Sequence, residues 1–189
     1  MKETKAIVLG NGKSRLEFDL NLLANEYYIY GCNALYREFI PDYLIAVDPN
    51  MVREILEANY CKKVYSYNRL SKIDKRIKYI EPNRGWASGP TAVKLAARHK
   101  HNEIYLLGFD INSNTDFINN VYAGTKNYKS PDSKKTYFSN WVNQLCTVFS
   151  EHPQTQFIRI LTREYNFIPK EFKEIPNLIH KSTNTIKMQ

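Results

Sequence analysis

The sequence predicts a single α/β domain built on a mostly parallel sheet with helices on both faces. Short runs of β-branched and aromatic residues recur along the chain, and amphipathic helical segments alternate with them. Parallel strands need crossover connections, which helices provide. A chain of 189 residues is also long enough to bury one core without disulfides. Together these observations favour a Rossmann-like domain.

The candidate strands are short apolar runs at residues 5–9, 27–30, 43–47, 63–67, 76–80, 103–107 and 156–160. Between them, apolar residues at three-and-four spacing predict helices at 49–59, 90–99 and 134–150. Ser88 or Gly89 is expected to cap the second helix, with Pro90 in its first turn. We expect the domain to span residues 1–175 and residues 176–189 to form a loosely ordered tail.

Composition limits the class of protein. There are 27 Lys and Arg against 19 Asp and Glu, a net charge of +8 that favours phosphates, nucleic acid or an anionic membrane as partners. Three widely spaced cysteines suggest neither a disulfide framework nor a zinc site. No signal peptide or spanning segment is evident. We therefore expect a cytoplasmic protein, and the composition is also compatible with a homo-oligomer.

The loop after the first strand is the first candidate for ligand binding, because ligands of open α/β sheets gather at the carboxyl ends of the strands. It contains Gly10, Asn11 and Gly12, and then Ser14, which forms a capping-box pattern with Glu17. A helix beginning there would attract phosphate. A simple strand-to-helix turn is the alternative. A P-loop is excluded because Ile7 stands where its first glycine is required. A dinucleotide site of the G-x-G-x-x-G type is excluded because Arg15 stands where its third glycine is required.

Further candidates follow the next strands. Asn33 follows the second strand and could read a base or ribose edge, although a buried turn asparagine is an equal alternative. Asp48 follows the third and could contact a metal or hydroxyl, although an N-cap before Pro49 is favoured.

Phosphate could bind where the Ala-rich helix begins, at Ser88, Gly89 and Thr91, unless these residues only allow tight packing. Gly108 and Asp110 end the next strand, and Asp110 is either a base or structural.

The polar segment 112–133 is too long for an ordinary connection, so we expect a lid over the site. The basic residues expected to close over a ligand are Lys126, Lys129, Lys134 and Lys135. No histidine is predicted at the site. The candidates for proton transfer are therefore Asp48, Asp110 and lid phenols such as Tyr122 and Tyr128.

Taken together, these motifs resemble the small bacterial sialyltransferases that decorate lipooligosaccharide. In that family a G-N-G-x-S loop, a C-N pair, an S-G pair opening a helix and an E-I-Y-L-x-G-x-D strand end surround a cytidine nucleotide sugar. The matching residues here are Gly10 to Ser14, Cys32 and Asn33, Ser88 and Gly89, and residues 103–110. The resemblance implies a pocket for a CMP-linked sugar with no required cofactor, and an acceptor that it does not identify.

The chain departs from that family in the lid, where the family has tyrosines and a catalytic histidine. Here the strand end continues as Ile111, Asn112, Ser113 and Asn114 without a histidine. The leading hypothesis is therefore a glycosyltransferase-like protein in which Asp110 or Tyr122 is the catalytic candidate.

Two alternatives remain open. Asp48-Pro49 and the run from Ser88 to Ala92 are similar to the V-D-P and S-G-P-T-A motifs of the hydroxymethylpterin pyrophosphokinase-like family, which implies pyrophosphoryl transfer from ATP with Mg²⁺ on Asp48 and Asp110. The other is a non-catalytic nucleotide- or nucleic-acid-binding protein with a basic lid.

Overall fold

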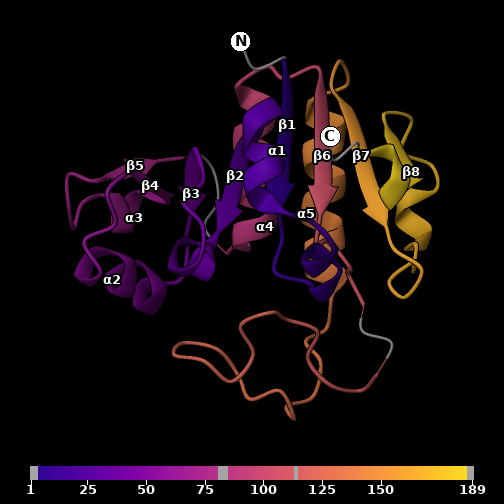
Figure 1. Cartoon of the computed structure of the whole chain (residues 1–189). Coiled ribbons are helices and arrows are strands. Elements are labelled where there is room, and N and C mark those ends of the chain that lie inside the picture. The colour runs from indigo at the N-terminus through magenta and orange to yellow at the C-terminus, as the bar shows by residue number, and fades with distance from the viewer. Residues whose placement is uncertain (1–3, 81–84, 113–114, 187–189) are drawn as a thin grey trace.

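The computed structural model describes residues 4–80, 85–112 and 115–186. Its centre is an eight-stranded sheet in the order β5-β4-β3-β2-β1-β6-β7-β8, and every neighbouring pair is parallel (Figure 1). The strands are β1 (Lys5–Leu9), β2 (Tyr28–Cys32), β3 (Tyr43–Ile45), β4 (Val64–Ser66), β5 (Ile77–Tyr79), β6 (Glu103–Leu107), β7 (Gln156–Leu161) and β8 (Leu178–Ser182). The predicted α/β fold is confirmed. The strand order reverses between β1 and β6, where sheets of this kind bind ligands.

Helices connect the strands. The α-helices are α1 (Leu20–Glu26), α2 (Pro49–Glu57), α3 (Asn68–Ser71), α4 (Ser88–Arg98) and α5 (Ser139–Glu151). The short 3₁₀ helices are η1 (Lys13–Glu17), η2 (Asn33–Arg37), η3 (Lys170–Phe172) and η4 (Thr183–Thr185). Among the described residues, no helix is long and apolar enough to cross a membrane.

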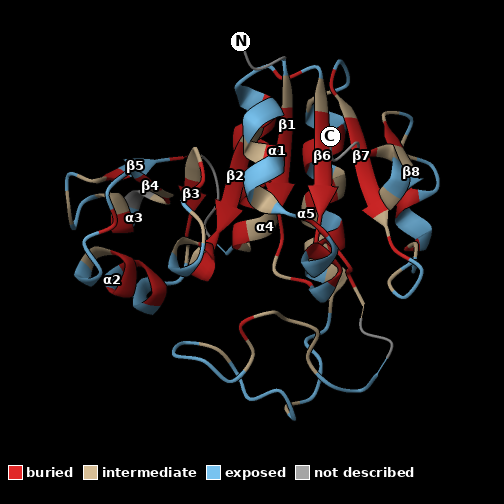
Figure 2. Ribbon diagram, viewed as in Figure 1, coloured by how far each residue is buried: buried red, intermediate tan, exposed pale blue. Residues whose placement is uncertain are grey.

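Helices cover both faces of the sheet, as the alternation within β1 shows. Ala6 and Val8 belong to a core cluster with residues of α4 and α5. Ile7 and Leu9 point the other way and pack in a cluster with Leu23 of α1. These four residues, which follow Lys5 in β1, are fully buried (Figure 2). A strand buried on both faces reads as a continuous apolar run, which is why β1 was recognisable in the sequence.

The two expected helix caps have different outcomes. The Asp48 carboxylate accepts hydrogen bonds from the backbone amides of Asn50 and Met51, with Pro49 in the first turn, so this N-cap is confirmed. The cap expected for α4 is wrong by one residue, because Ala87 is the N-cap and makes no side-chain capping bond. The amides at the start of α4 are therefore left for another partner.

The segment expected to be a loosely ordered tail, residues 176–189, instead joins the sheet as far as it is described. Leu178–Ser182 forms β8, which pairs with β7 over five residues. Ile186 is buried against the α1 face. The strand was missed because an edge strand is exposed on part of its surface, so its polar residues hid the pattern. Residues 187–189 lie outside the described part of the chain.

Candidate functional site

A cavity of about 520 Å³ lies at the carboxyl edge of the sheet. The loops after β1, β2, β3 and β6 line it, together with the start of α4 and the long β6–α5 connection, which passes beneath the strand ends in Figure 1. Among the residues predicted to bind the nucleotide or to act in catalysis, the cavity is lined by Gly10, Asn11, Gly12, Asn33, Asp48, Ser88, Gly89, Gly108 and Asp110. Ser14, Thr91 and Tyr122 do not line it, and the remaining lid residues are described below.

The loops after β1 and β6 form the floor of the cavity and touch through their backbones. The amide of Gly10 donates to the carbonyl of Leu107 at 2.8 Å, and that of Gly12 to the carbonyl of Gly108 at 3.0 Å. A Cβ atom at Gly12 would overlap the Asp110 carboxylate. Gly108 adopts φ of +71°, which favours glycine. The glycines therefore allow the two loops to close on each other.

Asp110 holds the β1 loop in place. Its carboxylate accepts hydrogen bonds from the Ser14 hydroxyl, from the Ser14 amide at 3.2 Å and from the Asn119 side-chain amide at 2.7 Å. Only 6% of Asp110 is exposed. The predicted capping box at Ser14 is therefore wrong, since the hydroxyl bonds to Asp110 and the segment is the five-residue 3₁₀ helix η1 with Gly12 as an N-cap that makes no side-chain bond. These contacts favour the structural alternative for Asp110.

Asn33 and Ser88 meet across the cavity wall. Asn33 adopts φ of +53°, a conformation that asparagine tolerates better than most residues. Its side-chain oxygen accepts a hydrogen bond from the Ser88 hydroxyl at 2.8 Å, and that hydroxyl accepts one from the Val47 amide at 3.3 Å. This contact joins the loops after β2 and β3 to the start of α4.

The start of α4 offers donors to an anion. Ser88, Gly89 and Pro90 line the cavity, and the helix runs for eleven residues. The first backbone amides of a helix have no partner within it, and the helix dipole attracts negative charge there. Thr91, expected to help hold phosphate, is fully buried, and its hydroxyl donates to the Ala87 carbonyl at 2.9 Å. The donors left for an anion there are the backbone amides of Ser88 and Gly89, since the Ser88 hydroxyl already donates to Asn33.

The lid is fastened to the β1 loop. The Val121 amide donates to the Asn11 carbonyl at 2.8 Å, and the Lys13 amide to the Asn119 side chain at 3.0 Å. The Asn11 side-chain nitrogen donates to the Tyr128 hydroxyl at 3.2 Å. Among the described residues, the side-chain oxygen of Asn11 is buried without a hydrogen-bond partner. A buried acceptor of this kind favours a ligand with a donor group.

Two of the four expected lid cations reach the cavity. Lys129 and Lys135 line it, whereas Lys134 does not. Lys126 lies outside and forms an exposed ion pair with Glu57, 3.8 Å apart. The cavity therefore has cationic side chains on its lid side, facing the loops of the sheet edge.

Tyr122 lies behind the cavity. Its hydroxyl bonds to Glu38 and accepts from the Arg15 guanidinium at 3.0 Å. Arg15 also pairs with Glu38 at 2.6 Å. Burial raises the pKa of Tyr122 above its ordinary range. These contacts make Tyr122 a residue that packs the lid against η1 and the end of η2, and they do not favour the catalytic role expected of its phenol.

Tyr128 is the phenol that does face the cavity. Its hydroxyl accepts from Asn11 and, at 3.4 Å, from the Ala34 amide. Burial raises the pKa of Tyr128 to about 12, so it keeps its proton at neutral pH.

Trp141 and Leu145 of α5 also line the cavity. Their spacing predicted an apolar helix face, and the part of that face beyond the sheet edge becomes cavity wall.

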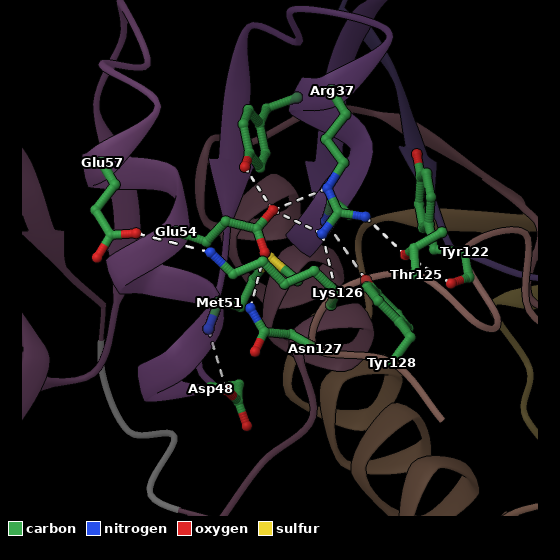
Figure 3. Close-up of polar contacts among 12 residues, drawn as sticks. Arg37, Asp48, Met51, Glu54, Glu57, Tyr122, Thr125, Lys126, Asn127 and Tyr128 are labelled. Atoms are coloured by element: carbon green, nitrogen blue, oxygen red, sulfur yellow. Dashed lines mark hydrogen bonds and ion pairs between the residues drawn. The ribbon is translucent and has the colours of Figure 1, made fainter. Parts of the chain in front are cut away.

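A cluster of ion pairs and hydrogen bonds anchors the other end of the lid to α2 and η2; we call it the Arg37–Glu54 latch (Figure 3). The Arg37 guanidinium binds the Glu54 carboxylate at 2.6 and 2.8 Å, the Thr125 hydroxyl at 2.7 Å and the Lys126 carbonyl at 2.9 Å. Asn127 donates to Glu54 at 2.7 Å. Burial raises the pKa of Glu54, but hydrogen bonds from Tyr36, Arg37 and Asn127 outweigh it and hold the pKa below its usual range.

Removing the latch should loosen the lid. In Arg37→Ala, Thr125 and Lys126 lose their shared partner, so we expect trypsin to cut at the lid lysines roughly ten times faster, as local opening costs about 1.4 kcal/mol less. Limited proteolysis followed by mass spectrometry measures this rate. Arg53→Ala is the matched control. Arg53 lies on α2, and among the described residues its side chain donates a hydrogen bond to Asn50, at 3.4 Å, and none to the lid. Equal cleavage rates for both variants would contradict the latch.

The two carboxylates expected to bind Mg²⁺ both accept hydrogen bonds from protein donors. Asp48 caps α2 through one oxygen, and both oxygens of Asp110 accept from protein donors. The described residues contain no group of three or more His, Cys, Asp or Glu side chains that could hold a metal ion. A magnesium ion on Asp110 would compete with the hydrogen bonds that hold η1.

Comparisons with known proteins give structural neighbours of low similarity. No family model matches the chain, and no curated protein matches it. One solved structure is the sialyltransferase CstII from Campylobacter jejuni in complex with a substrate analogue, cytidine-5′-monophosphate, with 15% identity, coverage of 84% of this chain and 80% of that one, and a TM-score of 0.49. Another is a point mutant of the α-2,3/8-sialyltransferase CstII, with 15% identity, 82% and 80% coverage, and a TM-score of 0.45. With identities of 15% and TM-scores below 0.5, these neighbours carry no functional argument. A functional assignment therefore rests on the cavity.

Proposed function

We propose that this chain is a glycosyltransferase-like protein that binds a nucleotide sugar, linked to CMP, in the cavity at the carboxyl edge of the sheet. One observation carries the proposal. The four motifs that resemble the sialyltransferase family, which are far apart in the sequence, contribute residues to the same cavity. That cavity lies beside the reversal of strand order, where α/β sheets of this kind bind nucleotides.

The proposed phosphate position is the start of α4. The backbone amides of Ser88 and Gly89 and the helix dipole would hold the phosphate, with Lys129 and Lys135 on the lid side. Tyr128, which stays protonated, can donate a hydrogen bond to the same group. When the sugar is transferred, negative charge develops on the leaving nucleotide. Fixed donors aimed at that charge stabilise the transition state more than the ground state.

The proposed nucleoside position lies beside Asn11 and Asn33. The unpartnered oxygen of Asn11 would accept a hydrogen bond from an amine or hydroxyl of the nucleoside. The lid, fastened to Asn11 through Val121 and Tyr128, would then exclude water from the bound nucleotide. In this arrangement Asp110 is a positioning residue, because it holds the loop that carries Asn11 and Gly12.

A thermal-shift titration with CMP, CMP-sialic acid, UDP, GDP and ATP tests the proposal. A ligand that binds only the folded state raises the melting temperature, and we expect CMP and CMP-sialic acid to do so. Asn11→Ala should weaken CMP binding about tenfold, because the ligand donor loses its acceptor. Asn21→Ala, which removes an exposed amide on α1, is the control. No shift with either cytidine ligand, or an unchanged CMP affinity in Asn11→Ala, would refute the proposed site.

A further inference from the structure

A second cavity, of about 570 Å³, lies at the opposite edge of the sheet. Its lining residues lie within three residues before the neighbouring strands β3, β4 and β5 or in the first two residues of β3 and β4, so they gather at the amino ends of these strands. We call it the basic groove, and it is lined by Asp42, Tyr43, Cys61, Lys62, Lys63, Tyr65, Lys75 and Arg76. None of these residues lines the cavity at the carboxyl edge.

Positive charge is concentrated around the basic groove. The segment 62–78 carries seven Lys and Arg residues and a single acidic residue, Asp74, in a chain whose net charge is +8. Lys63 and Lys75 are exposed on the rim. Asp74 pairs with Arg76 at 2.9 Å, and the one carboxylate among the described lining residues, Asp42, accepts from the Ile29 amide at 2.8 Å. The groove therefore presents a positive potential that attracts polyanions.

Aromatic rings form the floor of the basic groove. The rings of Tyr43 and Tyr65 are 5.8 Å apart and both are partly buried. Tyr43 stacks on Tyr30 at 4.6 Å and lies 4.7 Å from the His99 ring. Burial raises the pKa of both groove tyrosines, so they stay neutral. Tyr43 is thus held in place by Tyr30 and His99, and both tyrosines contribute to the lining of the groove.

We propose that the basic groove binds single-stranded nucleic acid, with bases against Tyr43 and Tyr65 and phosphates on the cations of the rim. Aromatic platforms combined with a positive groove are the features that bind single strands without sequence preference. A concave site with its rings in a recess suits a flexible chain better than a flat bilayer, which would contact protruding apolar side chains. The groove is separate from the proposed nucleotide-sugar site, so each can exist without the other.

Fluorescence anisotropy with a labelled oligothymidylate of about eight nucleotides, a length within the range that one single-strand-binding domain covers, tests the groove. We expect binding that weakens as salt rises from about 50 to about 200 mM, because phosphate contacts release counterions. Lys63→Glu combined with Lys75→Glu should weaken binding at least about tenfold. Tyr65→Leu, which keeps apolar packing but removes the ring, should weaken it about fivefold.

The matched control is Lys170→Glu with Lys173→Glu, which makes the same change in net charge on exposed residues at η3. It should bind the oligonucleotide within about twofold of the wild type, since its charges lie elsewhere. Melting temperatures of all variants confirm that each is folded. No oligonucleotide binding, or equal losses in the two double variants, overturns the proposal. So does a groove-dependent affinity for vesicles with anionic lipid in the absence of oligonucleotide binding.

Discussion

Replacing Asp110 with alanine is expected to lower the free energy of unfolding by about 3 kcal/mol and to abolish ligand binding in the carboxyl-edge cavity. The carboxylate accepts from the hydroxyl and amide of Ser14 and from Asn119. Removing it leaves buried donors without an acceptor, each at a cost of about 1–3 kcal/mol. The loop with Asn11 and Gly12 would lose its anchor. Urea unfolding measures the stability, and CMP titration measures the binding.

Two further variants separate the structural role of Asp110 from a catalytic one. Asp110→Asn keeps the shape but turns a donor toward Ser14 or Asn119, so it should lose most of the same stability. If Asp110 were instead a base, this variant would lose activity while unfolding at the wild-type urea concentration. Asp116→Ala, in an exposed part of the lid, is the control and should change stability by less than about 0.5 kcal/mol.

The sequence was sufficient to predict which loops meet at the site. Parallel strands bring their carboxyl ends to one edge, so Asn11, Asn33, Ser88 and Gly108 could be placed together from the strand runs alone. The cap at Asp48 was also predictable, because a capping contact is local and involves only residues two and three positions away.

Contacts between distant segments were not predictable from the sequence. Ser14 and Glu17 form a capping-box pattern, but the hydroxyl of Ser14 binds Asp110, 96 residues away. A serine hydroxyl can form its hydrogen bond with a capping backbone amide or with a carboxylate such as that of Asp110. Only the packing of β1 against β6 decides between the two. Tyr122 and Tyr128 lie in the same lid, yet one faces Glu38 and the other the cavity. Nothing local distinguishes two tyrosines in a polar loop, because the path of the lid depends on the latch.

Arg159 is a further residue whose role the sequence concealed. It lies within the apolar run of β7, where an arginine is usually read as exposed, but only 1% of it is accessible. Its guanidinium donates to the carbonyls of Phe109 at 2.7 Å, Phe167 at 2.8 Å and Asp110 at 3.2 Å. Burial lowers its pKa to about 10, so it remains charged at neutral pH. This side chain ties the turn after β6 to the segment that follows β7.

Arg159→Met is expected to lower the free energy of unfolding by about 3 kcal/mol, since a side chain of similar length removes the guanidinium donor from the carbonyls of Phe109 and Phe167 and leaves that of Asp110 with only the Asn112 amide. Urea denaturation measures the loss. Arg159→Lys should recover less than half of it, because one ammonium group cannot reach three carbonyls that a planar guanidinium spans. Arg163→Met, an exposed arginine in the next loop, should leave stability unchanged within about 0.5 kcal/mol. Full recovery by lysine would mean that the charge matters and the three-way contact does not. Loss of CMP affinity in Arg159→Met, at a urea concentration where the variant is still folded, would show that the turn it holds also shapes the cavity.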